Sequence, residues 1–135
     1  MGIRSSRTLM ACIFAMASTL AQAGDTIKVG VIAEMTGTFA DFGRHIVNGA
    51  TAYMKQYGDT VWGKKVELII RDSTGPAPDV ANRLAQELVV KDNVDFIVGF
   101  GLTPNALAVA PIVTEAKKPM IVMNAATSII TTKSP

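Results

Sequence analysis

The sequence has 135 residues, of which 13 are basic and 11 are acidic, so that its formal net charge is +2. Two of the basic residues, Arg4 and Arg7, lie at the N-terminus, and the rest of the chain has equal numbers of basic and acidic side chains. This balance gives no electrostatic reason to expect a nucleic-acid partner. The length suffices for the apolar core of one domain.

The first residues have the three-part pattern of a secretory signal peptide. The two arginines precede an apolar run, Leu9–Leu20, and Ala21-Gln22-Ala23 offers a small-residue cleavage site. The run is shorter than the roughly 20 apolar residues of a membrane-spanning helix. We therefore expect residues 1–23 to be a signal peptide that is cleaved on export. Cys12 is the only cysteine and would leave with it, so that residues 24–135 would have no disulfide although their destination is oxidising.

Four apolar segments rich in Val and Ile predict β-strands. Their polar and apolar residues barely alternate, as expected of parallel strands that are covered on both faces. Helical spacing of apolar residues predicts a helix after each of the first three segments. The predicted strands are Ile27–Ala33, Val66–Ile70, Phe96–Val98 and Met120–Met123, and the predicted helices are Asp41–Tyr57, Asp79–Lys91 and Pro104–Lys117.

The first and third helices carry one further expectation each. In the third helix, Pro111 removes a backbone donor, so that we expect a kink or a restart there. In the first helix, the spacing places five side chains on one apolar face: Ile46, Ala50, Tyr53, Met54 and Tyr57.

The strand–helix–strand alternation with short connections predicts a doubly wound parallel sheet with helices on both faces, a three-layer α/β architecture. In such sheets ligands bind beyond the carboxyl ends of the strands, where the strand order reverses. If the predicted strands are arranged in the order 2-1-3-4, the reversal lies between the first and the third. Four loops would then line a crevice: Glu34–Phe42, Asp72–Asp79, Gly99–Thr103 and Asn124–Ser128.

Two phosphate-binding motifs are approached but not completed. The stretch GDTVWGKK, Gly58–Lys65, has Lys65 where a P-loop needs Ser or Thr, and it leads from a helix into a strand, the reverse of the P-loop order. We interpret it as a solvated turn. The stretch GFGLTP has Pro104 where the dinucleotide-binding fingerprint has its third glycine. No nucleotide cofactor is expected.

The sequence offers no catalytic set. His45 is the only histidine, and nothing predicts a nucleophile beside it, so that we interpret it as a surface residue. Glu34 and Asp41 could form a carboxylate pair at the crevice rim, but Asp41 is equally explained by the preference for acidic residues at a helix start. A metal site would need clustered His, Cys or carboxylate ligands, which the pattern does not show. We expect neither an enzyme nor a metal site.

Thr103 and the segment Asn124–Ser128 are the polar candidates for the crevice. Thr103 followed by Pro104 is typical of a helix N-cap, and capping is the simpler role for its hydroxyl. A ligand contact is compatible with capping, because the free N–H groups of a helix N-terminus attract a carboxylate. In the second segment two alanines would let a ligand approach the backbone and two hydroxyl residues follow, although an ordinary polar turn explains them equally well.

The order of these segments resembles the type I periplasmic solute-binding proteins, and within them the leucine/isoleucine/valine-binding family of ABC importers. The stretches that carry the resemblance are IKVGVIAEMTGTFADFGRHIVNGATAYMKQ, VELIIRDSTGPAPDVANRLAQELV, DFIVGFGLTPNALAVAPIVTEAKKPMI and NAATSIITTKSP. The resemblance implies a two-lobed periplasmic protein that closes on a small solute and delivers it to an inner-membrane ABC permease. Residues 24–135 would form an incomplete N-terminal lobe of it.

The resemblance also implies a ligand site. The loop after the third strand would offer the Thr103 hydroxyl to a ligand carboxylate, and the loop after the fourth strand would contribute Ala125 and Thr127. Phe42, in the loop after the first strand, would cover the ligand. The family's usual Gly-Pro after the first strand is Gly37-Thr38 here. The expected ligand is a branched-chain or other amino acid, and an aromatic carboxylate is an alternative.

Family members have a two-domain length of roughly 350 residues or more, so that this sequence is expected to be a fragment. Because affinity in hinged proteins depends on closure of both lobes, we expect residues 24–135 alone to bind ligand weakly or not at all. Two other functions stay open on the sequence: a ligand-sensing domain of a receptor or regulator, and a small exported enzyme whose catalytic residues the pattern does not reveal.

Overall fold

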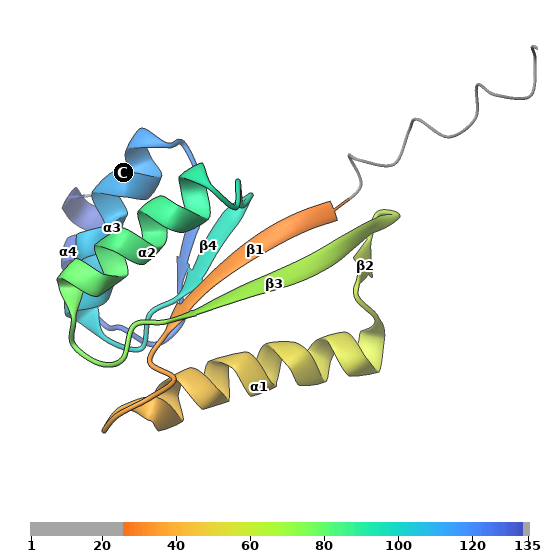
Figure 1. Cartoon of the computed structure of the whole chain (residues 1–135), viewed down its shortest axis with the longest axis horizontal. Helices are drawn as coiled ribbons and strands as arrows, with labels where there is room; N and C mark the ends of the chain where they lie inside the picture. Colours follow the sequence, from red (N-terminus) through yellow and green to blue (C-terminus); the bar gives the residue numbers. More distant parts are fainter. Residues whose placement is uncertain (1–25, 134–135) are drawn as a thin grey trace, which may run out of the picture.

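The described part of the chain, residues 26–133 of a computed structural model, alternates strands with helices as the sequence predicts (Figure 1). Every predicted element occurs, and each of its ends lies within two residues of the expected position. The elements are β1 (Thr26–Ala33), α1 (Ala40–Tyr57), β2 (Thr60–Val61), β3 (Lys64–Asp72), α2 (Pro78–Val90), β4 (Phe96–Gly99), α3 (Thr103–Glu115), β5 (Met120–Val122) and α4 (Ser128–Lys133). The expected signal peptide lies outside the described residues.

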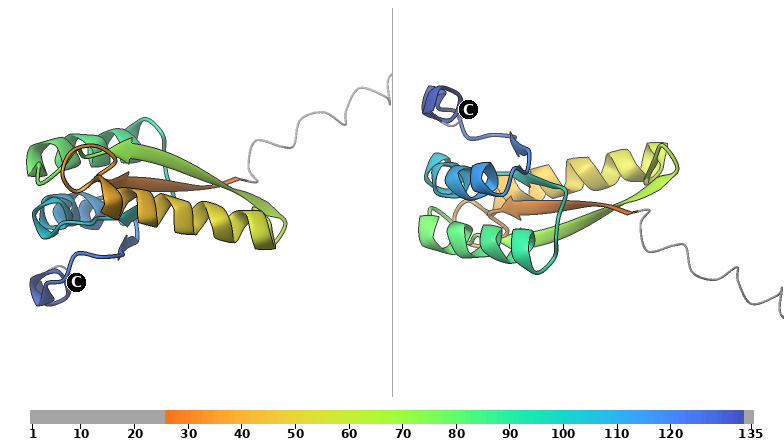
Figure 2. Two further views of the ribbon diagram at one scale, coloured as in Figure 1. Left: turned by 90° about the horizontal axis from the view of Figure 1, so that it is seen from below. Right: turned by 90° about the horizontal axis from the view of Figure 1, so that it is seen from above.

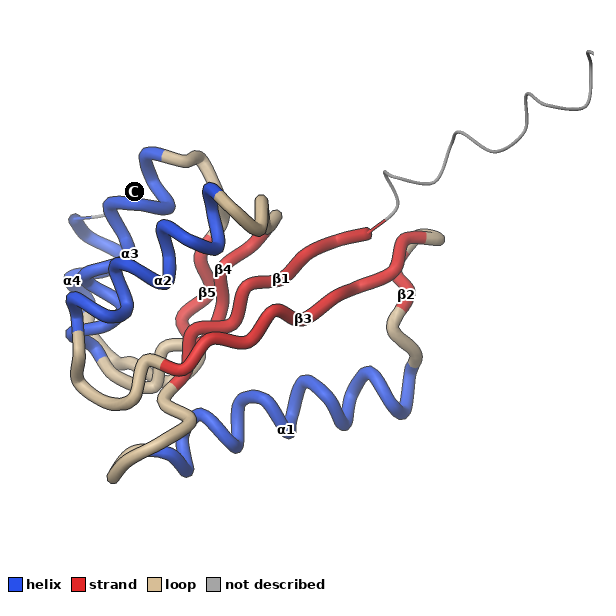
Figure 3. The backbone as a smooth tube through the Cα atoms, viewed as in Figure 1, coloured by secondary structure: helices blue, strands red, loops and turns tan. Residues whose placement is uncertain are grey.

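The strands form one sheet in the order β2-β3-β1-β4-β5. β1 pairs in parallel with β3 on one side and with β4 on the other, and β4 pairs in parallel with β5. The predicted parallel order and its reversal beside the first strand are therefore confirmed. The sequence did not predict β2, a two-residue strand antiparallel to β3, which makes the stretch Gly58–Lys65 a β-hairpin (Figure 3).

Helices α2 and α3 cover one face of the sheet, and α1 crosses the other face (Figures 1 and 2). The larger core lies under α2 and α3, where Ile32 and Ile97 of the central strands are fully buried in one cluster with Leu88 and Val109 of the helices. Burial stabilises the fold by roughly 1.5–3 kcal/mol for each side chain of this kind. This core holds β1 and β4 together, and so it positions the loops that follow them.

The face under α1 is covered less completely. Its smaller core contains Val31, Ala33 and Val98, with Ile46 and Val47 of α1 packed against them. Paired residues of neighbouring strands lie on the same face of a sheet. Ile70, which pairs with Val31, and Ile121, which pairs with Val98, are nevertheless 39% and 52% exposed.

The expected apolar face of α1 is only partly correct. Tyr53 and Tyr57 are 64% and 66% exposed, and their rings contact each other at 4.7 Å between centroids. The last turns of α1 extend towards the hairpin end of the molecule, where β3 continues without a helix-covered core (Figure 1). Spacing alone therefore predicted the face of the helix but not the length over which the sheet covers it.

The expected restart at Pro111 does not occur, because α3 continues through it from Thr103 to Glu115. Pro111 has no N–H group to donate to the carbonyl group one turn earlier in the helix. Because Pro111 is exposed, that carbonyl group lies on the side of the helix that water can reach. No helix within residues 26–133 is both long and apolar enough to cross a membrane.

Candidate functional site

The carboxyl ends of the parallel strands meet at one edge of the sheet. Ala33 of β1 pairs with Asp72 of β3, Ile32 pairs with Gly99 of β4, and Gly99 pairs with Val122 of β5. The four predicted crevice loops follow these residues, and Figure 3 shows them gathered at the same end of the molecule. The structure thus brings together the loops in which the sequence-predicted site residues lie.

A buried polar cluster lies directly beneath these loops. Glu34, Ser73 and Asn105 are each fully buried. The Glu34 carboxylate accepts a hydrogen bond from the Gly101 N–H at 3.1 Å and another from the Asn105 side-chain amide at 2.9 Å. A buried carboxylate is costly unless it has hydrogen-bond partners. These two bonds therefore join the end of β1 to the start of α3.

Asn105 extends the cluster to the loop between β3 and α2. Its amide group also donates to the Gly75 carbonyl at 2.8 Å and lies 3.3 Å from the Ser73 hydroxyl, while its carbonyl oxygen accepts from the Ala77 N–H at 3.0 Å. No buried side-chain N or O atom among the described residues lacks a partner. One side chain thus connects α3 to two of the four crevice loops.

The close packing at this edge requires glycine at several positions, and two of these glycines contact Glu34. A Cβ at Gly43 would lie 2.2 Å from the Glu34 carbonyl oxygen, and a Cβ at Gly101 would lie 2.3 Å from the Glu34 carboxylate. Gly43 lets α1 approach the end of β1, and Gly101 lets the β4–α3 loop lie on the carboxylate. Both glycines lie beside the crevice in the sequence, but the spacing of apolar residues did not indicate that they contact Glu34.

Asp72 fixes the loop after β1 from the other side. Its carboxylate accepts hydrogen bonds from the Met35 N–H, the Thr36 hydroxyl and the Thr74 N–H at 2.7–2.8 Å. Partial burial acts to raise the pKa of Asp72, but the hydrogen bonds from Thr36, Thr74 and Met35 together bring the pKa below its ordinary value. The carboxylate is therefore engaged with the protein itself.

Phe42 and Thr103, two of the predicted ligand contacts, lie at the crevice edge. Phe42, in the first turn of α1, is 39% exposed, and its ring stacks on Phe39 with 6.1 Å between centroids. Thr103 is the first residue of α3 and is half-buried. The expectation that Thr103 caps α3 is wrong: the capping position is Leu102, and no side-chain cap hydrogen bond is present.

Ala125 and Thr127, the other two predicted contacts, already make hydrogen bonds within the protein. The Ala125 N–H donates to the Phe100 carbonyl at 3.0 Å. The Thr127 hydroxyl oxygen accepts from the Ile129 N–H at 3.3 Å, at the start of α4. A ligand would therefore meet the Thr127 hydroxyl hydrogen and the Ala125 methyl or carbonyl group.

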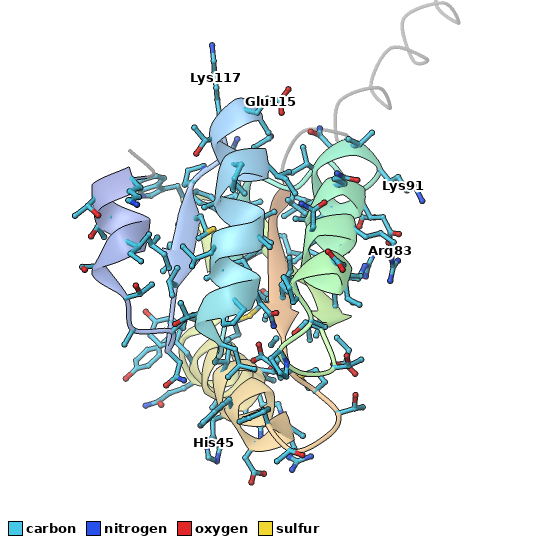
Figure 4. The ribbon with its side chains drawn as sticks, turned by 90° about the vertical axis from the view of Figure 1, so that its left-hand side faces the viewer. His45, Arg83, Lys91, Glu115 and Lys117 are labelled. Atoms are coloured by element: carbon cyan, nitrogen blue, oxygen red, sulfur yellow. The ribbon has the colours of Figure 1, made fainter. Side chains whose placement is uncertain are left out.

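The other predicted polar residues of the crevice have separate roles. Glu34 and Asp41 do not form the suggested carboxylate pair, because Glu34 is buried whereas Asp41 is exposed and bonded to Arg44 at 2.6 Å. The hydrogen bond and charge of Arg44 lower the pKa of Asp41. His45 lies on the outside of α1 (Figure 4). No group of three or more His, Cys or acidic residues within 26–133 could hold a metal ion.

An open cavity of about 400 Å³ borders the crevice between α1 and the end of β5. Its lining is mostly apolar or aromatic and has no carboxylate: Phe42, His45, Ile46, Gly49, Ala50, Met123 and Asn124. Asn124 also donates to the Gly101 carbonyl at 2.9 Å, which links the last crevice loop to the third. The edge as a whole offers hydroxyl and helix N–H donors beside aromatic surface, an arrangement suited to a small carboxylate.

Comparison with known proteins identifies the class. The profile of the periplasmic binding protein family matches residues 26–135, and the chain belongs to this family. Among curated relatives, the Leu/Ile/Val-binding protein homolog 6 of Brucella abortus is 46% identical over 123 residues. The match covers 91% of this chain but only 31% of that relative, so that the chain spans about a third of the length of the relatives it matches.

Solved structures of solute-binding proteins have the same fold. A solute-binding protein of an ABC transporter from Rhodopseudomonas palustris, in complex with 3,4-dihydroxybenzoic acid, is 56% identical with a TM-score of 0.80, over 82% of this chain and 30% of that chain. Another from R. palustris, in complex with 4-hydroxybenzoate, is 52% identical with a TM-score of 0.79 over the same shares. A leucine-binding protein from Thermotoga maritima is 30% identical with a TM-score of 0.75, over 80% and 30%.

Proposed function

We propose that this chain is the first lobe of the solute-binding component of an ABC importer, which captures a small carboxylate in the periplasm and delivers it to an inner-membrane permease. The family and the fold support this function. The observation that carries it is the crevice edge, where Glu34, Asn105 and Gly101 hold the β4–α3 loop and the N-terminus of α3 in place without using the Thr103 hydroxyl.

The ligand carboxylate would lie at the N-terminus of α3. Thr103 and the first N–H groups of the helix would donate hydrogen bonds to it, aided by the positive end of the helix dipole. The Thr127 hydroxyl would approach from the loop after β5, and Ala125 would allow a close approach of the backbone. Closure of a second lobe over the ligand would then exclude water.

We infer that the ligand is an aromatic carboxylate rather than a branched-chain amino acid. The benzoate-binding relatives are 52–56% identical to this chain, against 46% for the Leu/Ile/Val-binding protein homolog 6 and 30% for the leucine-binding protein. Phe42 offers an aromatic surface at the rim. The carboxylates of Glu34, Asp41 and Asp72 are all engaged within the protein, so that none of them would pair with the ammonium group of an amino acid.

A thermal-shift panel on the purified natural protein tests the ligand class. It would compare 4-hydroxybenzoate and 3,4-dihydroxybenzoate with leucine, isoleucine and valine, because a ligand that binds only the folded state raises the melting temperature. We expect the benzoates to raise it and the amino acids to leave it unchanged. A shift with leucine alone would contradict the ligand class, and the absence of any shift with all carboxylates would contradict the proposed function.

The same proposal excludes catalysis. The family and the similar solved structures are solute-binding proteins, and the crevice residues described here are all assigned to binding or to structure. Incubation of the benzoates with the protein, followed by mass analysis of the ligand, would return them unchanged. Any product whose formation needs Thr103 would contradict this inference.

A further inference from the structure

The hairpin between β2 and β3 exposes the only tryptophan of the sequence. Trp62 lies at the tip, where it is 97% exposed, and Val61 beside it is 45% exposed. A tryptophan that stays in water gains none of the free energy that burial of an indole ring provides. Packing within this chain therefore does not explain why an aromatic residue stands at the tip.

The backbone of the turn also disfavours tryptophan. Trp62 and Gly63, the two residues between the paired strands, have φ values of 50° and 79°. Positive φ at both positions is the geometry of a type I′ turn, in which Asn-Gly is preferred. Gly63 fits this rule, but a bulky side chain at positive φ is strained. Both local structure and burial oppose Trp62, and strain of this kind is often found at functional sites.

Other exposed side chains lie at the same end of the molecule. Tyr53 and Tyr57 lie in the last turns of α1, only a few residues before the hairpin, and Lys64 and Lys65 follow the turn Trp62-Gly63. Figures 1 and 2 show the end of α1 and the hairpin together, at the opposite end of the sheet from the crevice loops. We call these five residues, Tyr53, Tyr57, Trp62, Lys64 and Lys65, the aromatic tip.

The charge of the aromatic tip points to an anionic partner. Both lysines are exposed, and none of the ion pairs within residues 26–133 involves them. Asp59 is the only acidic residue between Tyr57 and Lys65. Interfaces between proteins are enriched in Trp and Tyr but depleted in Lys. Trp and Tyr together with Lys are instead typical of the surface of an anionic membrane.

The start of the sheet lies beside the tip. Thr26, the first residue of β1, pairs with Lys65, so that the chain enters the sheet at this end. The tip is therefore remote from the crevice loops, which follow the other ends of the strands (Figure 1).

We propose that the aromatic tip docks this protein on an anionic lipid bilayer. The Trp62 ring enters the headgroup region, and Lys64 and Lys65 contact lipid phosphates. With one tryptophan and few lysines the attachment is weak and reversible, and it is reduced by salt because its charges are exposed.

Trp62 is the only tryptophan within residues 1–135, and comparison of the wild type with Trp62→Phe isolates its contribution to the fluorescence. Vesicles of phosphatidylglycerol and phosphatidylcholine in equal parts would be added to the purified natural protein at low salt. We expect a blue shift of the emission and protection from iodide quenching, both reversed by high salt. Vesicles of phosphatidylcholine alone should give neither. An emission spectrum that the anionic vesicles leave unchanged would overturn the proposal.

Co-sedimentation with the same vesicles extends the test to variants. Reversal of charge in Lys64→Glu/Lys65→Glu should weaken binding roughly tenfold or more. The matched control is Lys91→Glu/Lys117→Glu, which changes the same charge at two exposed lysines on other elements (Figure 4). Trp62→Asn should reduce binding while its urea midpoint rises, a pair of opposite effects that misfolding cannot produce. Equal binding by the Lys64/Lys65 variant and the control, or full binding by Trp62→Asn, would overturn the proposal.

Discussion

The two ends of the sheet are built on opposite principles. At the crevice end, polar side chains are buried and bonded, as in the contacts of Glu34 with Gly101 and Asn105. At the hairpin end, aromatic side chains are exposed and Trp62 has a strained backbone. The crevice end is fixed in one geometry, which a binding site requires. The hairpin end keeps residues that folding does not favour, which indicates an interaction outside the fold.

The largest effect is expected from Asn105→Ala. The substitution removes the side chain that connects α3 to two loops and leaves Glu34 buried with one partner fewer, which costs about 3 kcal/mol of the free energy of unfolding. Urea unfolding measures the loss. The control is Asn82→Ala, because Asn82 is half-buried and donates one hydrogen bond, to the Ala108 carbonyl at 3.3 Å. Equal losses of unfolding free energy in the two variants would show that the buried cluster contributes no more to stability than a single half-buried hydrogen bond.

Glycine substitutions should differ in sign between the crevice and α1. Gly101→Ala places a Cβ 2.3 Å from the Glu34 carboxylate and 3.0 Å from the Phe42 Cβ, and we expect a loss of about 1–3 kcal/mol. Gly49→Ala, within α1, meets nothing within 4 Å and should stabilise the protein by roughly 1 kcal/mol. Thermal unfolding of both variants is the measurement. A Gly101→Ala variant as stable as the wild type would contradict the packing described for this loop.

Asp72 predicts a dependence of stability on pH. Its pKa is lower in the folded protein, since the hydrogen bonds from Thr36, Thr74 and Met35 outweigh partial burial. The stabilisation is therefore present above the unfolded pKa of about 3.9 and is lost as the pH falls through the folded value. Asp72→Asn should lose about 1 kcal/mol at pH 7. Its urea midpoint should also change less with pH in the acid range, and an unaltered slope would argue against this role.

The smallest effect, and the only one at the hairpin end, is a gain of stability. Trp62→Asn replaces a strained residue by one that the turn prefers, so that the free energy of unfolding should rise by about 0.5–1 kcal/mol. Trp62→Phe keeps the strain and serves as the control. A fall in stability with Asn would mean that the indole ring contributes to folding, and the contrast between the two ends would then fail.

Much of the fold could be predicted from the sequence, because apolar runs and helical spacing act locally. β1 and β4 form where Val and Ile accumulate, and the order of the parallel strands follows from the connections. β2 was missed because two residues give no periodicity. Pro111 was judged by its local effect, but the helix tolerates it on its exposed side.

The crevice was predicted in position but not in construction. The loops were placed by the rule for parallel sheets, and Phe42 and Thr103 lie at the expected edge. The buried cluster was missed, because the Glu34 carboxylate is buried against a hydrogen-bond partner, Asn105, that is 71 residues away in the chain. The sequence signal was a carboxylate directly after an apolar strand and an asparagine within an alanine-rich helix. Such a pair becomes interpretable only once the topology brings β1 and α3 together.

Isothermal titration calorimetry on the purified natural protein tests the central claim, that Thr103 and the N-terminus of α3 hold a carboxylate. The titrations would compare 4-hydroxybenzoate with 4-hydroxybenzamide, in Thr103→Ala and in Thr114→Ala at the other end of the same helix. We expect Thr103→Ala to weaken benzoate binding roughly 10-fold to 100-fold, Thr114→Ala to leave it unchanged, and the amide to bind poorly throughout. Equal affinity of the wild type and Thr103→Ala for the benzoate would contradict the claim.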